Sequence, residues 1–292
     1  MLLEIAKGDA YGAGFEYAAA DFVSKNNDLS AYRQHPKHAI KPGCYTDDAQ
    51  QSIANALALL SGKPLTRELF ADLYVSCFKR DVRLGYAGRF YDFLVSCTDG
   101  ADFLARIKPN SDKSGAAMRA SVFGILPTVG EVISVTTLQA KLTHDTKDGI
   151  NAAVAAALMS HYFLYGKGAR TGLSKFIESH VEGDWSTAWT QPVGEKGWMS
   201  VRAAITAVES DASMSAILKQ CVAFTGDVDT VAALALGAAA YAADVAQDLP
   251  QVLHDTLENG TYGRDYIIAL DTQLLARKAE LEAAHLAAQQ DS

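Results

Sequence analysis

The stretch Ala232-Ala-Leu-Ala-Leu-Gly-Ala-Ala-Ala240 decides the fold class, and Ala152-Ala-Val-Ala-Ala-Ala-Leu158 repeats its character earlier in the chain. Both stretches consist of Ala, Gly and aliphatic residues only, and a helix that is apolar all round is typical of a protein interior. Small side chains also let two helix axes approach each other closely. We therefore predict that both stretches are central helices of a compact bundle.

Apolar residues recur at helical spacing through much of the remaining chain. The predicted helices run from Thr46 to Leu60, Thr66 to Phe78, Gly149 to Tyr165, Val201 to Ser210, Asp211 to Phe224, Asp229 to Ala246 and Asp265 to Ala288. Alternation with a period of two is hard to find, so we predict an all-α fold. Gly, Pro, Asp and Ser mark three predicted loops, namely Ala31 to Cys44, Cys97 to Ser114 and Val181 to Lys196.

The composition fits a globular protein with a substantial core, because 49% of the 292 residues are hydrophobic and 21% are charged. There is no internal repeat and no linker-like shift in composition. We therefore expect one domain over residues 1–292. The last predicted helix, at about residues 264–288, is more polar and should lie at the periphery of this domain.

Charge and patterning exclude several classes of partner. The net charge of −8 argues against a protein that binds the nucleic-acid backbone, since neutralising phosphates requires a basic face. No run of about 18 apolar residues suggests a membrane span, and the first residues do not form a secretory signal. Four widely spaced cysteines fit reduced thiols. We expect a cytoplasmic protein without a membrane partner.

Two acidic clusters each precede an apolar helix: Thr46-Asp47-Asp48 and Asp227-Val-Asp229-Thr230. Either cluster alone is explained by helix capping, because Asp and Thr at a helix start accept free N–H groups and complement the helix dipole. Together they offer four carboxylates and two hydroxyls, which are the hard oxygen ligands that Mg²⁺ or Mn²⁺ prefers. If the two helix starts converge, metal binding relieves the repulsion between these carboxylates.

Three further elements are candidates for the same site. The Gly-rich run Lys7-Gly-Asp-Ala-Tyr-Gly-Ala-Gly-Phe-Glu-Tyr17 permits close packing or close approach to a ligand, with Glu16 as an acid, base or gate. The polar loop before Arg119 can present N–H groups to a diphosphate, and Lys113 or Arg119 can add charge, although an ordinary capped helix explains it too. His144 stands just ahead of an Ala-rich helix, and a lone histidine is more often a hydrogen-bonded structural residue than a catalyst.

As an ordered set, these residues resemble the motifs of the ADP-ribosylglycohydrolase family, which includes the dinitrogenase reductase-activating glycohydrolases. The matching motifs are Gly8-Asp-Ala-x-Gly12, Glu16, Thr46-Asp-Asp48, Gly115-Ala-Ala-Met-Arg119, Thr143-His144, Gly197-Trp198 and Gly226-Asp-x-Asp-Thr230. The resemblance implies a compact orthogonal helical bundle with a central dinuclear site for two Mg²⁺ or Mn²⁺ ions. It also implies hydrolysis of the bond between C1″ of ADP-ribose and an acceptor, such as an arginine side chain.

The resemblance assigns roles by position. The implied metal ligands are Thr46, Asp47, Asp48, Asp227, Asp229 and Thr230, with Glu16 near the metals. Asp48 or Glu16 would transfer the proton; Ser114, Gly115 and Ala116 would bind the diphosphate, and His144 would line the distal-ribose side. The chain departs from the family at Lys113-Ser114, where the family has Gly-Asn, and at Ala49, where it has a hydroxyl residue.

Two other functions fit the same residues. One is a binding protein that uses the scaffold to neutralise an ADP-ribosylating toxin, and the other is a two-metal hydrolase of phosphate esters. The full set of acidic ligands favours an enzyme over the binding protein. Trp185 and Trp189, in a predicted loop, either contact the acceptor or pack as buried anchors.

Overall fold

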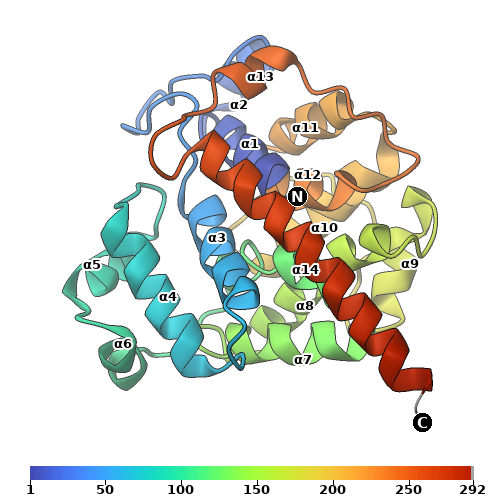
Figure 1. The fold of residues 1–292 in the computed structure, drawn as a ribbon. Helices are drawn as coiled ribbons and strands as arrows, with labels where there is room; N and C mark the ends of the chain where they lie inside the picture. Colours follow the sequence, from blue (N-terminus) through green and yellow to red (C-terminus); the bar gives the residue numbers. More distant parts are fainter. Residues whose placement is uncertain (291–292) are drawn as a thin grey trace.

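The computed structural model describes residues 1–290 and contains no β-strand in that range, which confirms the all-α prediction (Figure 1). The α-helices are α1 (Leu2–Gly12), α2 (Ala20–Asn26), α3 (Asp47–Leu60), α4 (Arg67–Arg80), α5 (Gly88–Ser96), α6 (Gly100–Arg106), α7 (Val129–Ala140), α8 (Lys147–Leu164), α9 (Leu173–Glu178), α10 (Gly197–Ser210), α11 (Met214–Ala223), α12 (Val228–Ala239), α13 (Gln251–Asp255) and α14 (Arg264–Gln290). Three short 3-10 helices are η1 (Ser114–Ala116), η2 (Ser121–Ile125) and η3 (Arg170–Gly172).

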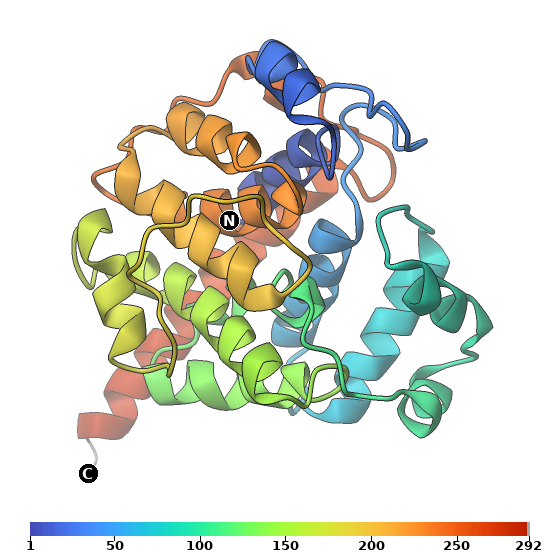
Figure 2. The same cartoon turned by 180° about the vertical axis from the view of Figure 1, so that it is seen from behind.

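The two Ala-rich stretches form the centre of the bundle, as predicted. Every residue of α12 is buried, and α12 packs against α1, α3, α8, α10 and α11. Most of α8 is buried as well. Helices α4 to α6 lie together on one side, and α14 crosses one face diagonally (Figure 1). The 181–196 segment crosses the opposite face (Figure 2).

Helix α1 lies with its backbone directly against α12. A Cβ atom at Gly8 would be only 2.5 Å from the carbonyl oxygen of Ala232, and one at Gly12 would collide with the Cα of Asp229. On the facing helix, a Cβ at Gly237 would lie 2.6 Å from Cγ1 of Ile5. Only glycine fits at these contacts. The interlocking glycines bring the end of α1 to the beginning of α12.

Several predicted boundaries were wrong. The helix expected from Asp229 to Ala246 ends at Ala239, and the loop expected from Cys97 to Ser114 contains α6, whose start is capped by the Asp99 carboxylate. Helices α1 and α7 were not predicted. The start of α7 carries a capping box formed by Thr128 and Glu131, a signal in the sequence that could have identified it.

Of the two tryptophans in the 181–196 segment, Trp185 is a buried anchor and Trp189 is partly buried. Trp185 is 3% exposed, and its indole N–H donates to the carbonyl of Val181. Trp189 packs edge-on against Trp198, with ring centroids 5.8 Å apart. Among residues 1–290, no helix is long and apolar enough to cross a membrane.

We expect the substitution Gly12→Ala to destabilise the protein by about 1–3 kcal/mol, because an added methyl group must push α1 away from α12. Gly130→Ala is the matched control. Gly130 lies in α7, where a Cβ meets only the Thr128 hydroxyl at 3.9 Å, so that change should be neutral or stabilising by roughly 0.5–1 kcal/mol. Urea unfolding measures both variants. Equal stability of the two would contradict the close packing of α1 on α12.

Candidate active site

A cavity of about 320 Å³ opens where the ends of α1, α3 and α12 meet the loops around η1. The residues that line it are Glu16, Tyr17, Asp47, Asp48, Gln51, Gly85, Ala87, Phe90, Ile107, Lys108, Ser111, Lys113, Ser114, Gly115, Met118, Arg119, Thr143, His144, Glu195, Asp227, Asp229 and Thr230. Nearly all the side chains singled out from the sequence face this one space.

The two acidic clusters converge in this cavity, and Glu16 joins them. Carboxylate oxygens of Glu16, Asp227 and Asp229 lie within 4.8 Å of one another. Asp47 and Asp48 reach the cavity from the first turn of α3. The condition that the sequence left open, convergence of the two helix starts, is therefore met in the structure.

The residues at the N-cap positions of these two helices do not cap them with their side chains. Thr46 and Asp227 occupy the N-cap positions of α3 and α12, but neither side chain makes a capping hydrogen bond. The carboxylate of the fully buried Asp9 takes this role for α3: it accepts hydrogen bonds from the Thr46 hydroxyl at 2.7 Å and the Ala49 N–H at 2.9 Å. Because Asp9 caps α3, the side chain of Asp48 is free to face the cavity.

Asp9 was missed by sequence reasoning, although it stands in the quoted motif Gly8-Asp-Ala. The capping contact joins residues 37 positions apart, so no local pattern indicates it. Asp9 also determines the surroundings of Thr46, whose hydroxyl donates to it and which does not line the cavity. Ala116, expected near the diphosphate, is fully buried behind the lining, whereas its neighbours Ser114 and Gly115 line the cavity.

Backbone hydrogen bonds fix Glu16 beside the start of α12. Tyr17 has a positive φ of 49°, and its N–H donates to the carbonyl of Gly226 at 2.8 Å. The His35 ring donates through Nε2 to the carbonyl of Glu16, also at 2.8 Å. The His35 Nδ1 accepts two backbone N–H groups of its own loop. The 31–44 loop therefore positions Glu16 from a distance.

Burial raises the pKa of every acid in the cluster. Burial is the largest cause for Asp47, Asp48 and Asp229, and the neighbouring carboxylates add to it. Burial, with Asp227 and Asp9 adding to it, raises the pKa of Glu16 to about 7. Oδ1 of Asp48 is buried without a hydrogen-bond partner. Such a cluster of oxygen ligands could hold a metal ion, which would offset the repulsion.

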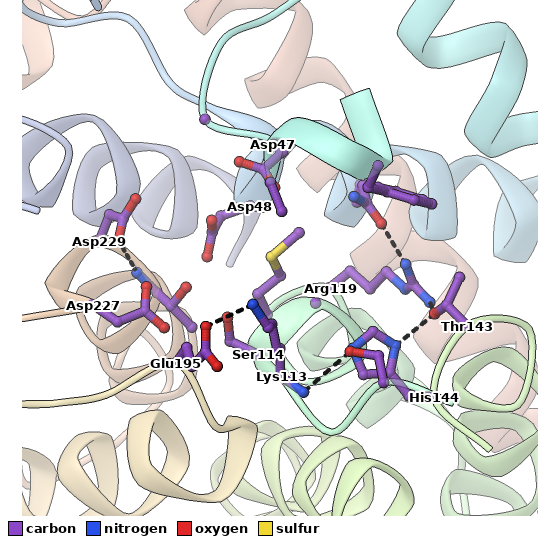
Figure 3. A pocket seen from close by; sticks show the side chains of 18 of the residues that line it. Asp47, Asp48, Lys113, Ser114, Arg119, Thr143, His144, Glu195, Asp227 and Asp229 are labelled. Atoms are coloured by element: carbon purple, nitrogen blue, oxygen red, sulfur yellow. Dashed lines mark hydrogen bonds and ion pairs between the residues drawn. The ribbon is translucent and has the colours of Figure 1, made fainter. Parts of the chain in front are cut away.

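The end of the cavity away from the acidic cluster carries a positive charge, that of Arg119. Figure 3 shows the acids on one side and Arg119, Thr143 and His144 on the other, with Lys113, Ser114 and Glu195 between them. Lys113 Nζ lies 2.6 Å from the Glu195 carboxylate, and both side chains are half exposed. The Ser114 N–H donates to the carbonyl of Glu195 and is engaged within the protein. The cavity thus has an acidic end suited to cations and a basic end suited to anions.

The sequence profile of the ADP-ribosylglycohydrolase family matches residues 1–285. The chain belongs to the ADP-ribosylglycohydrolase family. A solved structure described as an ADP-ribosylglycohydrolase-related protein complex has a similar fold, with a TM-score of 0.72, 21% sequence identity and 96% of each chain covered. No curated protein sequence matches the chain significantly. The resemblance drawn from the motifs is confirmed, and family membership supports hydrolysis of ADP-ribose conjugates in general.

Part of the cavity wall had no signal in the sequence. Gly85 has a φ of +107°, and a Cβ there would collide with the carboxylate of Asp47, so the 81–87 loop closes tightly over α3. Arg83 anchors this loop, with its guanidinium 3.5 Å from the ring centroid of Tyr45. Glu195 also lay within a stretch predicted only as a loop.

We expect Mg²⁺ or Mn²⁺ to raise the melting temperature of the wild-type protein, because an ion held at a hundredfold excess over its Kd adds about 2.7 kcal/mol of stability. Asp229→Asn should lose this response. In the metal-free state, the same variant should be more stable than wild type, since one of the repelling charges is removed.

The control is Asp21→Asn, which changes an exposed acid outside the cavity lining and should keep the wild-type response. Thermal unfolding with and without EDTA measures all three proteins. An identical metal response in wild type and Asp229→Asn would contradict a cation site at the acidic end.

Proposed function

We propose that this protein hydrolyses the C1″ bond of an ADP-ribosyl conjugate with two Mg²⁺ or Mn²⁺ ions held at the acidic end of the cavity. The observation that carries the proposal is the convergence of Glu16 with the two aspartate clusters, opposite a basic end, in one cavity. Asp47, Asp48, Asp227 and Asp229 would hold the ions, with the hydroxyl of Thr230, which also lines the cavity, completing the shell.

The bound ions would supply Lewis acidity toward the ribose hydroxyls and a water molecule. The protein's own carboxylates stabilise the positive charge that develops on the ribose ring, since glycosidic hydrolysis passes through an oxocarbenium-like state. The bond from C1″ to the acceptor breaks, the hydroxyl of water joins C1″, and the acceptor leaves with a proton.

Glu16 is our first candidate for proton transfer and Asp48 is the second. Glu16 is partly exposed, whereas the other four acids are buried, so Glu16 is the acid most accessible to an acceptor. Asp48 has an oxygen without a partner, but α3 holds it deep in the cavity. A proton-transfer group must reach both the water and the leaving group, which favours Glu16.

The basic end suits the diphosphate. Ser114 and Gly115 line the cavity next to Lys113, a cation at the position where the family has a small residue. The acceptor would then lie at the mouth beside Tyr17, whose side chain is 52% exposed. A protein side chain such as arginine fits this open arrangement. The intact acid set argues against a protein that only occludes a toxin.

We expect Glu16→Gln and Asp48→Asn each to lower kcat by about 10²–10⁴-fold, because each removes a group that handles protons or charge in the transition state. Glu280→Gln, an exposed acid on α14, is the control and should keep wild-type turnover. The assay follows free ADP-ribose released from arginine-linked, serine-linked and nucleic-acid-linked substrates with each metal. Release of phosphate in place of ADP-ribose would support a phosphoester hydrolase.

The Lys113–Glu195 pair should tune the affinity for a diphosphate. We expect Glu195→Gln to tighten ADP binding and Lys113→Gln to weaken it by roughly tenfold, since a charge-assisted hydrogen bond contributes about 1.5–3 kcal/mol. Adenosine, which has no phosphate, should bind all variants alike. Calorimetry measures both ligands.

Variants of the exposed Lys147–Glu182 pair serve as matched controls, because that pair lies outside the cavity lining. If Glu195→Gln weakened ADP binding as much as Lys113→Gln did, competition between Glu195 and the diphosphate for Lys113 would be refuted.

A further inference from the structure

His144 lines the cavity and has one ring nitrogen without a hydrogen-bond partner. The side chain is 6% exposed and lines the cavity, and its Nε2 is buried without a hydrogen bond. The ring packs closely against Gly115, where a Cβ atom would lie only 3.1 Å from Cε1 of His144. The other nitrogen, Nδ1, lies 2.6 Å from the hydroxyl of Thr143. Which nitrogen carries the proton decides what His144 can bind.

Arg119 stands behind this pair and has no acidic partner among residues 1–290. Its guanidinium is 1% exposed, donates to the side-chain oxygens of Gln51, Gln139 and Thr143, and lies 4.4 Å from the ring centroid of Tyr74. The Nη2 to Thr143 Oγ1 distance is 2.8 Å. A guanidinium carries donors only, so the Thr143 oxygen must accept this hydrogen bond.

The position of the remaining proton follows from counting donors. The Thr143 hydroxyl has one proton, and its oxygen contacts only Arg119 and His144 in the described part of the chain. If Nδ1 of His144 donated to Thr143, the threonine proton would be buried without an acceptor, which costs about 1–3 kcal/mol. If the hydroxyl donates to Nδ1, every group in the chain from Arg119 to Nδ1 is satisfied.

We infer that Arg119 and Thr143 are positioning residues that fix His144 as a neutral imidazole with its proton on Nε2, so that it donates a hydrogen bond to an acceptor oxygen of the ligand. The burial of the ring and the nearby Arg119 charge lower the pKa of His144 to about 3, which fits the neutral form. His144 is then neither a general base nor a metal ligand. It selects for an oxygen without a proton, as in a phosphate or a sugar ring.

The chain offers a sharp pair of variants. Thr143→Ser keeps the hydroxyl, whereas Thr143→Val keeps the shape and removes both the donor to Nδ1 and the acceptor of Arg119. If Thr143 only fills space, both variants should change the state of His144 and the ligand affinity according to how much they disturb the packing. If Thr143 positions His144, only the variant that lacks the hydroxyl should change them.

The first measurement determines which ring nitrogen of His144 carries the proton, by long-range ¹H–¹⁵N NMR of protein labelled with ¹⁵N at histidine. We expect the wild type and Thr143→Ser to show His144 protonated at Nε2 alone at neutral pH, and Thr143→Val to show a mixture of the two neutral forms. A wild-type signal from an Nδ1-protonated ring or from an imidazolium would overturn the inference, whether or not Thr143→Val folds. An unchanged single Nε2-protonated form in a folded Thr143→Val would also overturn it.

The second measurement is the affinity for ADP-ribose, and this arm rests on the proposed function. We expect Thr143→Val to weaken binding by about tenfold, which corresponds to one lost hydrogen bond of about 1.4 kcal/mol, and Thr143→Ser to bind like the wild type. Equal affinity of all three proteins would overturn the role of His144 as a donor. If the wild type did not bind ADP-ribose, the proposed function would fail while the NMR result still decided the proton position.

Discussion

The contact between α1 and α12 is the constraint on which the site depends. Glycines at positions 8 and 12 allow the backbone of α1 to touch that of α12, and no larger residue fits there without moving one helix. This contact places Asp9 where it can cap α3 and places Glu16 beside Asp227 and Asp229. A single helix–helix contact therefore organises acids from three separate parts of the chain.

Buried carboxylates repel one another, and the repulsion is relieved when some of them bind a proton or when a cation lies between them. Here the neighbouring cations are not paired with the acidic cluster: Arg119 bonds only neutral side chains, and Lys113 pairs with Glu195 at the middle of the cavity. Both positive charges therefore lie outside the acidic cluster, Lys113 at the middle of the cavity and Arg119 at its far end. This separation suits a ligand whose ribose meets the acids and whose phosphates meet the bases.

Much of the fold could be predicted from the sequence, because helical periodicity is local. The Ala-rich helices α8 and α12 were recognised from composition, and the start of α3 was predicted within one residue. The end of α12 was missed, since Ala240 to Ala246 is as apolar as the helix before it. Helix α6 was missed because its seven residues are too few to show a clear helical periodicity.

The sequence by itself determined the chemistry of the candidate site: the hard oxygen ligands, their order along the chain and the family to which they belong. Only the tertiary structure decided what each group does. Two aspartates at the start of α3 can cap a helix or face a cavity, and the choice depends on Asp9, which lies on another helix. The direction in which His144 donates likewise depends on Arg119 and Thr143, because a proton position follows from three-dimensional contacts rather than from residue order.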